Sequence, residues 1–396
     1  MLGMADTITA RGLNRATLAR QLLLGREALG VEDAVRRVVA LQAQQPASPY
    51  VALWNRLAGF DPAELDAAFD GFRVVKSTLM RITLHAVHVD DYRALRAAVE
   101  PTVRGARLRD PRFRASGLSE ADAAVLLPEL LALVERPCGV GELEEWFAGR
   151  VPGVERGAAR TAWRMLRQWA PLWHAPVPDA PWGFTSDRRQ GFVAAGAGRR
   201  PAVSDEGAVA EGLRELVRRY LAGFGPATVA DVAQFALVQK GRVRAALREL
   251  GTEVEELAGE DGAVLFDVVG GARPPEDVEA PPRLMAMWDS VLLAYADRAR
   301  VLPAEYRKQV TRVNGDVLPT VLVDGYVAGV WRLVEDGAGV EVGAFRPLPE
   351  ETWEALAEEA GGLRGLLVER DAAAYRRYDH WWVKGLAVTE ARVFGG

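Results

Sequence analysis

Two of the three glutamines in the segment LQAQQP, residues 41–46, carry amides that could converge on one place, namely Gln42 and Gln44. Gln42 continues an apolar stripe at helical spacing that runs from Val31 to Val38, which predicts that its amide points toward the domain interior or an adjoining cleft. Gln44 follows at the point where Pro46 ends the predicted helix. An amide cannot accept a proton as a carboxylate does, so such a pair could act only through hydrogen bonds and carbonyl dipoles. From the residues alone, solvated or helix-capping glutamines are the more common explanation.

Cysteine and histidine are sparse in this sequence, and their scarcity argues against metal or cofactor chemistry. The single cysteine, Cys138, excludes an intrachain disulfide framework and any zinc or iron–sulfur site built from several cysteines. Of the four histidines, only His85 and His88 are close enough in sequence to suggest paired ligands. No P-loop, GxSxG or complete GxGxxG motif occurs. We therefore expect no metal and no cofactor.

The chain has 396 residues, of which 49% are hydrophobic and 26% are charged. This length suggests roughly two to four domains, each long enough to bury a core. No apolar run approaches the roughly 20 residues that cross a bilayer, and the stretch MLGMADTITARGLNR lacks the apolar centre of a signal peptide. We expect a cytoplasmic protein.

The net charge of -5 hides an uneven distribution of acidic and basic residues. Residues 72–115 and 150–200 each carry a net charge of +6, whereas residues 116–149, 251–290 and 335–371 carry -6, -8 and -7. A net acidic chain is usually a poor candidate for binding nucleic acid. Because salt screens exposed charges beyond about 8 Å at physiological ionic strength, the basic segments can still attract a polyanion while the acid lies elsewhere.

Residues 1–115 are predicted to form the first structural unit around the glutamines. Two helices come first, and the second holds the stripe that ends at Gln42. A short helix at 62–69 leads into FRVVKSTLMRITLHAVHV, which we expect to form a strand because it is rich in β-branched and apolar residues. Alternation along that strand would divide its side chains between two faces, with Arg81, Thr83 and His85 on one and Met80, Ile82, Leu84 and Ala86 on the other.

Two further units, residues 116–202 and 203–272, repeat this order of elements. The expected helices span 119–135, 141–148 and 155–169 in the second unit, and 209–224, 228–236 and 241–250 in the third. Each set is followed by a predicted hairpin, with turns at Asp187–Arg189 and Glu260–Gly262. Helix, short helix, basic helix and hairpin is the order of a winged helix-turn-helix unit, so the three copies suggest a tandem array.

Residues 283–396, which follow the linker GGARPPEDVEAPP, are expected to form a β-rich closing domain. The run VLPTVLVDGYVAGVWRL alternates around Asp324-Gly325, a strong short signal for a hairpin. One helix is predicted near residues 350–360. The predicted fold class is therefore α+β, with three tandem winged helix-turn-helix units and a C-terminal β-rich domain.

The segment LQAQQP is accompanied, in order along most of the chain, by LNRATLARQLLLGR, LMRITLHAV, YLAGFGPATVADVAQF, ADRARVLPAEYRKQV and NGDVLPTVLVDGYVAGVWR. Together these segments resemble the winged-helix DNA glycosylases of the AlkZ type, whose Gln-aliphatic-Gln motif LQAQQP matches. The resemblance implies a monofunctional glycosylase with three winged helices around a concave, positively charged channel for duplex DNA. It also implies that a β-hairpin in the cleft is needed for activity.

The resemblance further implies that Gln42 and Gln44 are catalytic, with Ala43 at the aliphatic position. YcaQ-type members carry Asp at the second position, so Gln44 places this chain with the branch that protects antibiotic producers from their own DNA-alkylating products. Because amides cannot act as a general base, the expected substrates are cationic alkylpurines, whose glycosidic bonds break without protonation. We expect bulky N7-alkylguanine adducts, with interstrand crosslinks as a further class, in duplex DNA. We also expect a monomer with no obligate protein partner.

The basic side chains expected to contact DNA fall into four sets. They are Arg81 and His85 on one strand face, the helical stripe Arg156, Arg160, Arg164 and Arg167, the turn residues Arg188 and Arg189, and the group Arg307, Lys308 and Arg312. The last two sets are alternative candidates for the cleft hairpin, and the sequence does not choose between them. For the first two sets, ordinary surface charge or a solvated helix face is the alternative interpretation.

Two other functions are compatible with the same elements. Three winged helices without catalysis would make a DNA-binding or transcription-regulatory protein, and a protein that sequesters the toxin itself is a weaker alternative. Paired amides outside the recognition helices favour the enzyme, because a regulator has no need of them.

Overall fold

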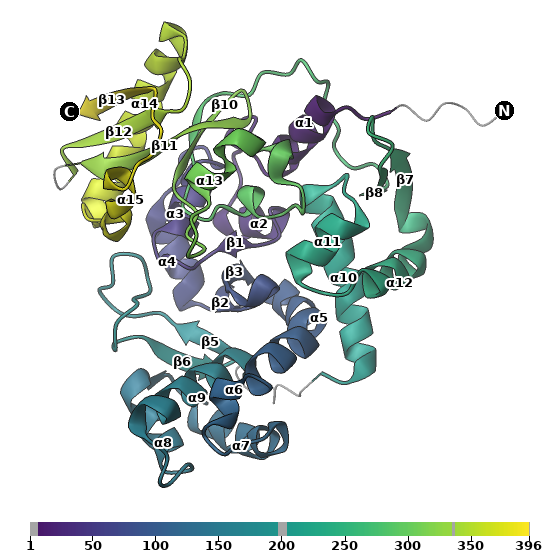
Figure 1. Ribbon diagram of the computed structural model, residues 1–396, viewed down its shortest axis with the longest axis vertical. Coiled ribbons are helices and arrows are strands. Elements are labelled where there is room, and N and C mark those ends of the chain that lie inside the picture. Colours follow the sequence, from purple (N-terminus) through teal and green to yellow (C-terminus); the bar gives the residue numbers. More distant parts are fainter. Residues whose placement is uncertain (1–6, 197–203, 335–336, 396) are drawn as a thin grey trace.

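The computed structural model describes residues 7–196, 204–334 and 337–395, which form a mixed chain of helices and strands (Figure 1). The first six residues of the N-terminal stretch and the expected boundary near residue 202 lie outside the described residues. In Figure 1 the second unit occupies the bottom of the view, and the C-terminal sheet lies at the upper left.

The first part of the chain places LQAQQP at the edge of a small sheet. Its elements are α1 (Ala10–Arg20), α2 (Val31–Arg37), β1 (Leu41–Gln42), α3 (Ser48–Trp54), α4 (Pro62–Asp70), β2 (Val74–Thr78), β3 (Leu84–His88), α5 (Val89–Leu108) and α6 (Pro111–Arg114). The strand order is β1-β3-β2, with Leu41 opposite Ala86 and Gln42 opposite His85. The short helix predicted at 62–69 is confirmed as α4.

The predicted helix through Gln42 is wrong. Helix α2 ends at Arg37, and the chain turns at Val39, whose φ is 73°, before Leu41 and Gln42 pair with β3 as a strand. The residues just before Gln42, 38–41, form a continuous apolar run, which fits a buried strand as well as the end of the helical stripe. Pro49 lies in the first turn of α3 instead of ending a helix, which is a position that proline favours.

The single strand predicted over residues 72–89 is a hairpin. Strands β2 and β3 pair antiparallel and are joined through a turn at Met80–Ile82, where Arg81 and the following residue have positive φ angles of 53° and 59°. The predicted alternation therefore fails at the turn and applies only to β3, where His85 lies on the opposite face from Leu84. The turn brings Arg81 back toward β1.

The second unit follows the predicted order of elements. It contains α7 (Glu120–Leu133), β4 (Cys138–Gly139), α8 (Val140–Ala148), α9 (Arg156–Trp169), β5 (Leu172–Ala175) and β6 (Gly191–Ala194). Ser119 caps α7 in a reciprocal capping box with Asp122. The strand order is β4-β6-β5, and the thiol of Cys138 is buried beneath this sheet.

The third unit has the predicted order of helices followed by a hairpin. It contains α10 (Glu206–Phe224), α11 (Val229–Ala236), α12 (Lys240–Leu250), β7 (Val254–Ala258) and β8 (Val264–Val268). Thr228 and Asp231 form a capping box at the start of the helix predicted over 228–236, and β7 and β8 form the predicted hairpin. Helix α10 packs closely on α5, a long helix that the sequence pattern did not reveal. A Cβ atom on Gly212 would lie 2.6 Å from the carbonyl oxygen of Ala94, so this close approach requires glycine.

The C-terminal part is a sheet in the order β13-β12-β11-β10-β9 that packs on α14. Its elements are β9 (Arg283–Leu284), α13 (Arg307–Val310), β10 (Thr320–Val323), β11 (Tyr326–Val334), β12 (Gly339–Ala344), α14 (Glu350–Arg370), α15 (His380–Val383) and β13 (Glu390–Gly395). The predicted hairpin at Asp324-Gly325 is confirmed between β10 and β11. The predicted helix near 350–360 is also confirmed, and it continues to Arg370.

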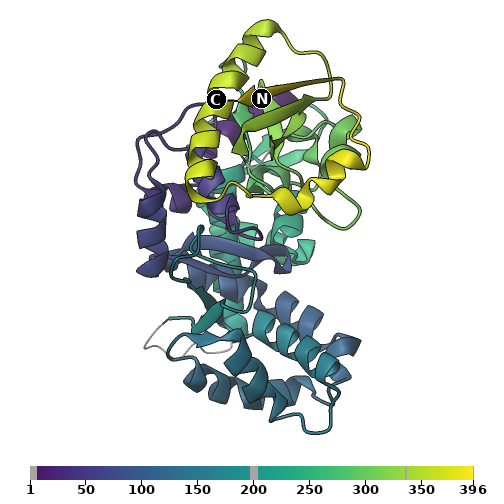
Figure 2. The ribbon, with the colours of Figure 1, turned by 90° about the vertical axis from the view of Figure 1, so that its left-hand side faces the viewer.

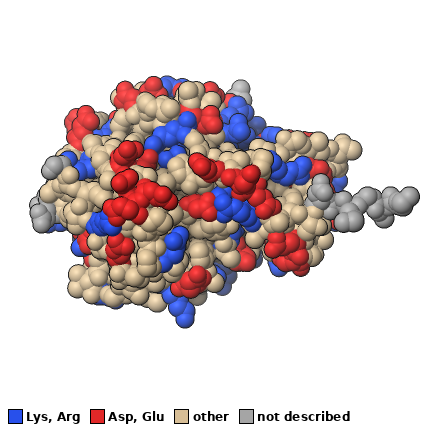
Figure 3. Space-filling model, turned by 90° about the horizontal axis from the view of Figure 1, so that it is seen from above, with Lys and Arg blue, Asp and Glu red and all other residues tan. Residues whose placement is uncertain are grey.

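The molecule is elongated, with the second unit below and the C-terminal domain above (Figure 2). The upper end carries interspersed acidic and basic side chains (Figure 3), whereas the basic segment that begins at residue 150 belongs to the lower end. Among the helices that the structure describes, none is both long and apolar enough to cross a membrane.

Candidate active site

Gln42 is held in one orientation by the β2–β3 hairpin. Its side chain is buried, its amide nitrogen donates to Thr83 Oγ1 over 3.0 Å, and its carbonyl oxygen accepts from Arg81 Nη2 over 3.0 Å. Because a donor and an acceptor each have a partner, the direction of the amide dipole is defined. One lone pair of the carbonyl oxygen is left for a further contact.

Gln44 is exposed, in contrast to Gln42. Its carbonyl oxygen accepts a hydrogen bond from the backbone amide of Leu84, with an N···O distance of 3.3 Å, and its amide nitrogen has no partner among the described residues. The intervening Ala43 is fully buried and donates its own N–H to the Leu84 carbonyl over 2.9 Å. Gln44 can therefore offer an N–H donor to a water molecule or a substrate.

Both glutamines line a cavity of about 800 Å³ that is assembled from segments far apart in the sequence. Residues 42–46 form one wall, and the loop 185–190 between β5 and β6 forms another. The C-terminal domain contributes residues 314–316, together with Trp288 and Tyr378. The volume is in the range of ordinary ligand sites, so it can admit a single nucleoside with its adduct.

Arg81 and His85, which were predicted to contact DNA, form a polar cluster with Gln42. Arg81 bridges Gln42 and the ring of Phe235, whose centroid is 5.2 Å from the guanidinium carbon, and burial lowers the pKa of Arg81 to about 10. His85 is fully buried, and burial followed by the charge of Arg81 lowers its pKa to about 3. The structure thus places Arg81 on the cavity wall and a neutral His85 behind it.

The four arginines of the predicted stripe on α9 line two different hollows. The C-terminal pair lies beside Gln44. Arg164 and Arg167 line a second cavity of about 500 Å³ that Gln44 also lines. Arg107 of α5 and Arg112 of α6 complete this wall. Burial lowers the pKa of Arg167 to about 10, yet the guanidinium stays charged at neutral pH. Four guanidinium groups around one hollow suit the recognition of phosphate.

The other half of the stripe lies near the β5–β6 loop. Arg156, Arg160 and Arg188 line one hollow, where Arg160 and Arg188 lie 3.6 Å and 3.5 Å from the carboxylate of Glu144. Arg189 forms an ion pair with the aspartate two residues before it. These arginines have acidic partners of their own, except for Arg156, which has none among the described residues.

The C-terminal candidate for the cleft hairpin is a short helix followed by a tight turn. Arg307 and Lys308 are exposed on α13, and Arg312 stands at the base of the turn. Val313 at its tip is fully exposed, and residues 314–316 line the cavity that contains Gln42 and Gln44. The loop with Arg188 lines the same cavity, whereas Arg307, Lys308 and Arg312 do not line it, so only the turn that follows the second candidate reaches the glutamines.

The chain matches the family described as DNA glycosylase AlkZ-like over residues 35–366. It belongs to the AlkZ-like DNA glycosylases. An interstrand DNA cross-link repair glycosylase from Streptomyces sahachiroi is 25% identical over 336 residues, which are 80% of this chain and 86% of that protein. The solved structure of the Streptomyces sahachiroi DNA glycosylase AlkZ has a TM-score of 0.75 at 22% identity, covering 92% of this chain and 98% of that one. The predicted family and α+β fold are confirmed.

Several basic groups in the cavities of this AlkZ-like glycosylase were not singled out from the sequence. Lys76 and His174 line the larger cavity, and Arg107 and Arg112 line the smaller one. Lys76, Arg107 and Arg112 lie in the segment 72–115, whose net charge of +6 was the available signal. Arg107 could not be placed from the sequence, because helix α5 was not predicted. His174 lies in the segment 150–200, which also has a net charge of +6, but nothing else in the sequence marked this histidine.

His85 and His88, the two histidines closest in sequence, make different contacts and do not act as a pair. The Nδ1 atom of His85 lies 3.1 Å from the Thr83 carbonyl oxygen, whereas Nδ1 of His88 accepts a bond from the Asp90 amide at the start of α5. Across the ranges that the structure describes, no three His, Cys, Asp or Glu side chains gather where they could hold a metal ion.

Proposed function

We propose that this glycosylase hydrolyses the N-glycosidic bond of cationic alkylpurines in duplex DNA, with Gln42 and Gln44 as its catalytic residues. The observation that carries the proposal is an anchored, buried amide beside a free, cavity-facing amide. A positively charged N7-alkylguanine or N3-alkyladenine leaves as a neutral base, so no acid is required to protonate it. The Streptomyces sahachiroi relative, named for interstrand cross-link repair, supports crosslinks as substrates. Bulky N7-alkylguanine adducts are proposed on the chemistry of the leaving group.

In the proposed reaction the two amides have separate tasks. The glycosidic bond breaks with its electron pair leaving on the base, and positive charge develops on the sugar. Gln42, fixed by Arg81 and Thr83, would place its carbonyl dipole against that charge without reorganising. Gln44 would donate its free N–H to the oxygen of the attacking water, which adds to C1′ and releases a proton to solvent. Positioning would thus replace proton transfer to a carboxylate.

Duplex DNA is the proposed partner of the basic walls. Arg107, Arg112, Arg164 and Arg167 would bind phosphates next to the lesion, because the smaller cavity adjoins Gln44. The concave channel expected for the family would run past this site. We further propose that the enzyme works as a monomer in the cytoplasm, without metal or cofactor, and protects a producer organism from its own genotoxin.

Arg164→Ala should weaken binding to all duplexes by a similar factor and reduce the slope of log K against log salt by about 1, because one phosphate contact is lost. Arg164 is exposed and forms no ion pair among the described residues, so its removal should leave the fold intact. Fluorescence anisotropy at several salt concentrations measures both quantities. Arg392→Ala serves as the control, because Arg392 is a half-buried arginine of β13 that pairs with Glu350 and lines neither cavity. An unchanged salt slope in Arg164→Ala would show that this arginine does not face phosphate.

An abasic-site assay tests the proposed function. The protein is incubated with duplexes that carry one defined N7-alkylguanine or one interstrand crosslink, and alkali then cleaves the strand wherever a base has been lost. We expect cleavage at the lesion in excess of the spontaneous rate without protein. Absence of cleavage over several cationic lesions, together with sequence-selective binding to undamaged DNA, would instead identify a non-catalytic winged-helix regulator.

A further inference from the structure

Asp316 is a carboxylate on the wall of the larger cavity that the proposed hydrolysis does not use. It is half-buried, and it lines this cavity together with Gln42 and Gln44. Among the described residues that line the cavity, one other carries a carboxylate, Asp187, which forms an ion pair with Arg189 at 3.0 Å. Asp316 has no ion-pair partner in the described part of the chain, so its negative charge is available to a ligand.

The carboxylate of Asp316 is held at one oxygen and open at the other. Its Oδ2 atom accepts hydrogen bonds from Trp381 Nε1 and from Asn314 Nδ2, each over 2.9 Å. Its Oδ1 atom has no hydrogen bond among the described residues. The turn that carries it is also held, because Trp288 Nε1 donates to the carbonyl oxygen of Gly315 over 3.0 Å. Since both oxygens of a carboxylate are acceptors, Oδ1 is left for a positively charged group.

The part of the wall that the C-terminal domain contributes is aromatic. Trp288 and Tyr378 both line it, with their ring centroids 5.5 Å apart and their planes at 82°. Arg377 lines it as well, but its guanidinium carbon lies 4.8 Å from the centroid of the Tyr378 ring and it forms no ion pair with Asp316. Aromatic faces attract cations, and a carboxylate supplies a counter-charge. This wall therefore suits a flat cation.

The rest of the cavity wall is basic. Lys76, Arg81, Arg167 and Arg188 all line it. A positively charged purine placed among these groups would be repelled, because like charges raise the energy of the bound state. The distribution of charge therefore favours a position in which the sugar lies beside the catalytic amides and the cationic base lies toward Asp316.

We propose that the wall formed by Asp316, Trp288 and Tyr378 binds the positively charged purine of the lesion, and that Asp316 distinguishes a cationic base from a neutral one. This inference rests on the proposed function, since it names the part of that site that selects the substrate. A neutral guanine would exclude water from Oδ1 without offering a counter-charge, which costs affinity. A cationic N7-alkylguanine or N3-alkyladenine supplies that charge. Because the purine becomes neutral as its bond breaks, Asp316 acts on selection of the lesion and not on the rate of cleavage.

Binding to two uncleavable lesions of the same shape tests this proposal. One duplex carries 2′-fluoro-N7-methylguanine, a cation whose glycosidic bond is stabilised by the electron-withdrawing fluorine. The other carries the neutral 7-methyl-7-deazaguanine with the same fluorine. Fluorescence anisotropy below neutral pH, where the N7-methylated purine is fully cationic, measures both affinities for the full chain. We expect the wild-type protein to prefer the cation by about tenfold, the effect of one hydrogen bond to a charged group, and Asp316→Asn to lose this preference.

Asp187→Asn is the matched control, because it removes the other carboxylate of the cavity and should keep the wild-type preference. The amide oxygen in Asp316→Asn can still accept from Trp381 and Asn314, and a ratio of two affinities is insensitive to a general loss of DNA binding. No preference in the wild-type protein, or an equal preference in Asp316→Asn, overturns the proposal. Either of these results with intact base excision counts against the subsite alone. A preference that Asp316→Asn abolishes, without base excision by the wild-type protein, counts against the proposed function alone.

Discussion

Gln42→Ala should lower the single-turnover rate of base excision by about 10²- to 10³-fold, the size of effect seen when one preorganised polar group is removed from an active site. The substitution removes the carbonyl dipole that would face the sugar in the proposed reaction, and it also releases Arg81 from its 3.0 Å contact. Gln44→Ala should lower the rate by a similar factor, because the proposed hydrogen bond that positions the attacking water is lost. Because Gln44 is exposed and its amide nitrogen is unbonded within the described residues, this second variant should leave the fold unchanged.

Gln239→Ala is the matched control for both variants, because Gln239 is an exposed glutamine at the start of α12 and lines neither cavity. Rates should be measured with saturating enzyme on an N7-alkylguanine duplex, and DNA affinity should be measured in parallel. We expect affinity to change much less than rate in Gln42→Ala and Gln44→Ala. Wild-type rates in both variants would remove the glutamines from the mechanism.

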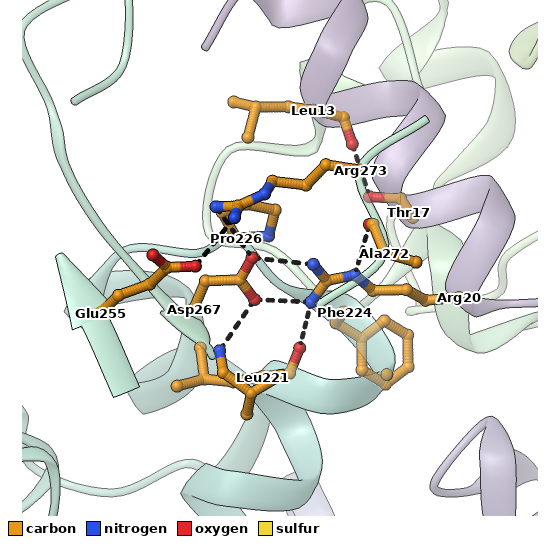
Figure 4. Close-up of polar contacts among 12 residues, drawn as sticks. Leu13, Thr17, Arg20, Leu221, Phe224, Pro226, Glu255, Asp267, Ala272 and Arg273 are labelled. Carbon is orange, nitrogen blue, oxygen red and sulfur yellow. Dashed lines mark hydrogen bonds and ion pairs between the residues drawn. The ribbon is translucent and has the colours of Figure 1, made fainter. Parts of the chain in front are cut away.

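Asp267→Ala should reduce the free energy of unfolding by about 3–5 kcal/mol, because it leaves a guanidinium buried without its counter-ion. Asp267 is fully buried and holds Arg20 through contacts of 2.6 Å and 2.8 Å (Figure 4). Arg20 also donates to the carbonyl oxygens of Leu221 and Ala272. This pair therefore fastens α1 to α10 and β8, so its loss should loosen the first unit from the third.

Glu255→Ala is the matched control in the same cluster. Glu255 pairs with Arg273 at 2.8 Å, but about a third of each side chain is exposed, and pairs of this kind contribute about 1 kcal/mol or less (Figure 4). Chemical denaturation followed by tryptophan fluorescence measures both variants. The double variant Arg20→Met/Asp267→Leu should recover much of the lost stability, since apolar side chains carry no desolvation cost. Equal stability losses in Asp267→Ala and Glu255→Ala would refute this explanation.

Elements with strong local signals were predictable from the sequence. The capping box of Thr228 and Asp231 marks the start of α11, and Asp324-Gly325 marks the turn between β10 and β11. These signals are local because a cap or a tight turn is satisfied by residues within a few positions of each other. The same reasoning located α7, α8, α9 and the β7–β8 hairpin.

The local structure around Gln42 was not predictable in the same way. The buried run that precedes Gln42 has the pattern of a helix end, and pairing of Gln42 with His85 of β3, 43 positions later, makes it a strand. Likewise, the run from Phe72 to Val89 has strand composition throughout. The turn inside it needs positive φ angles at Arg81 and the next residue, and the run contains no glycine or asparagine that would have indicated such a turn. Tertiary contacts overrode local pattern in both places.

The two glutamines and the C-terminal half of the arginine stripe line the two cavities, as the sequence led us to expect of site residues. The sequence could not show which other residues complete the cavity walls. Lys76 carries no local mark of burial, because the packing that lowers its pKa to about 7 includes Phe184, in a loop more than 100 residues later. Arg107 joins the smaller cavity only because α5 crosses beneath α9. Long-range packing therefore determines the electrostatics of the site, whereas the motif indicates its position.

Mass-spectrometric detection of the released base is the most direct test of glycosidic hydrolysis by this protein. A duplex with one N7-alkylguanine is incubated with wild-type protein, and free modified base and abasic sites are quantified in the same sample against a control without protein. Hydrolysis predicts one intact modified base for each abasic site, at a rate well above spontaneous loss. Strand damage without free base, or base release at the spontaneous rate for every cationic lesion, would contradict it.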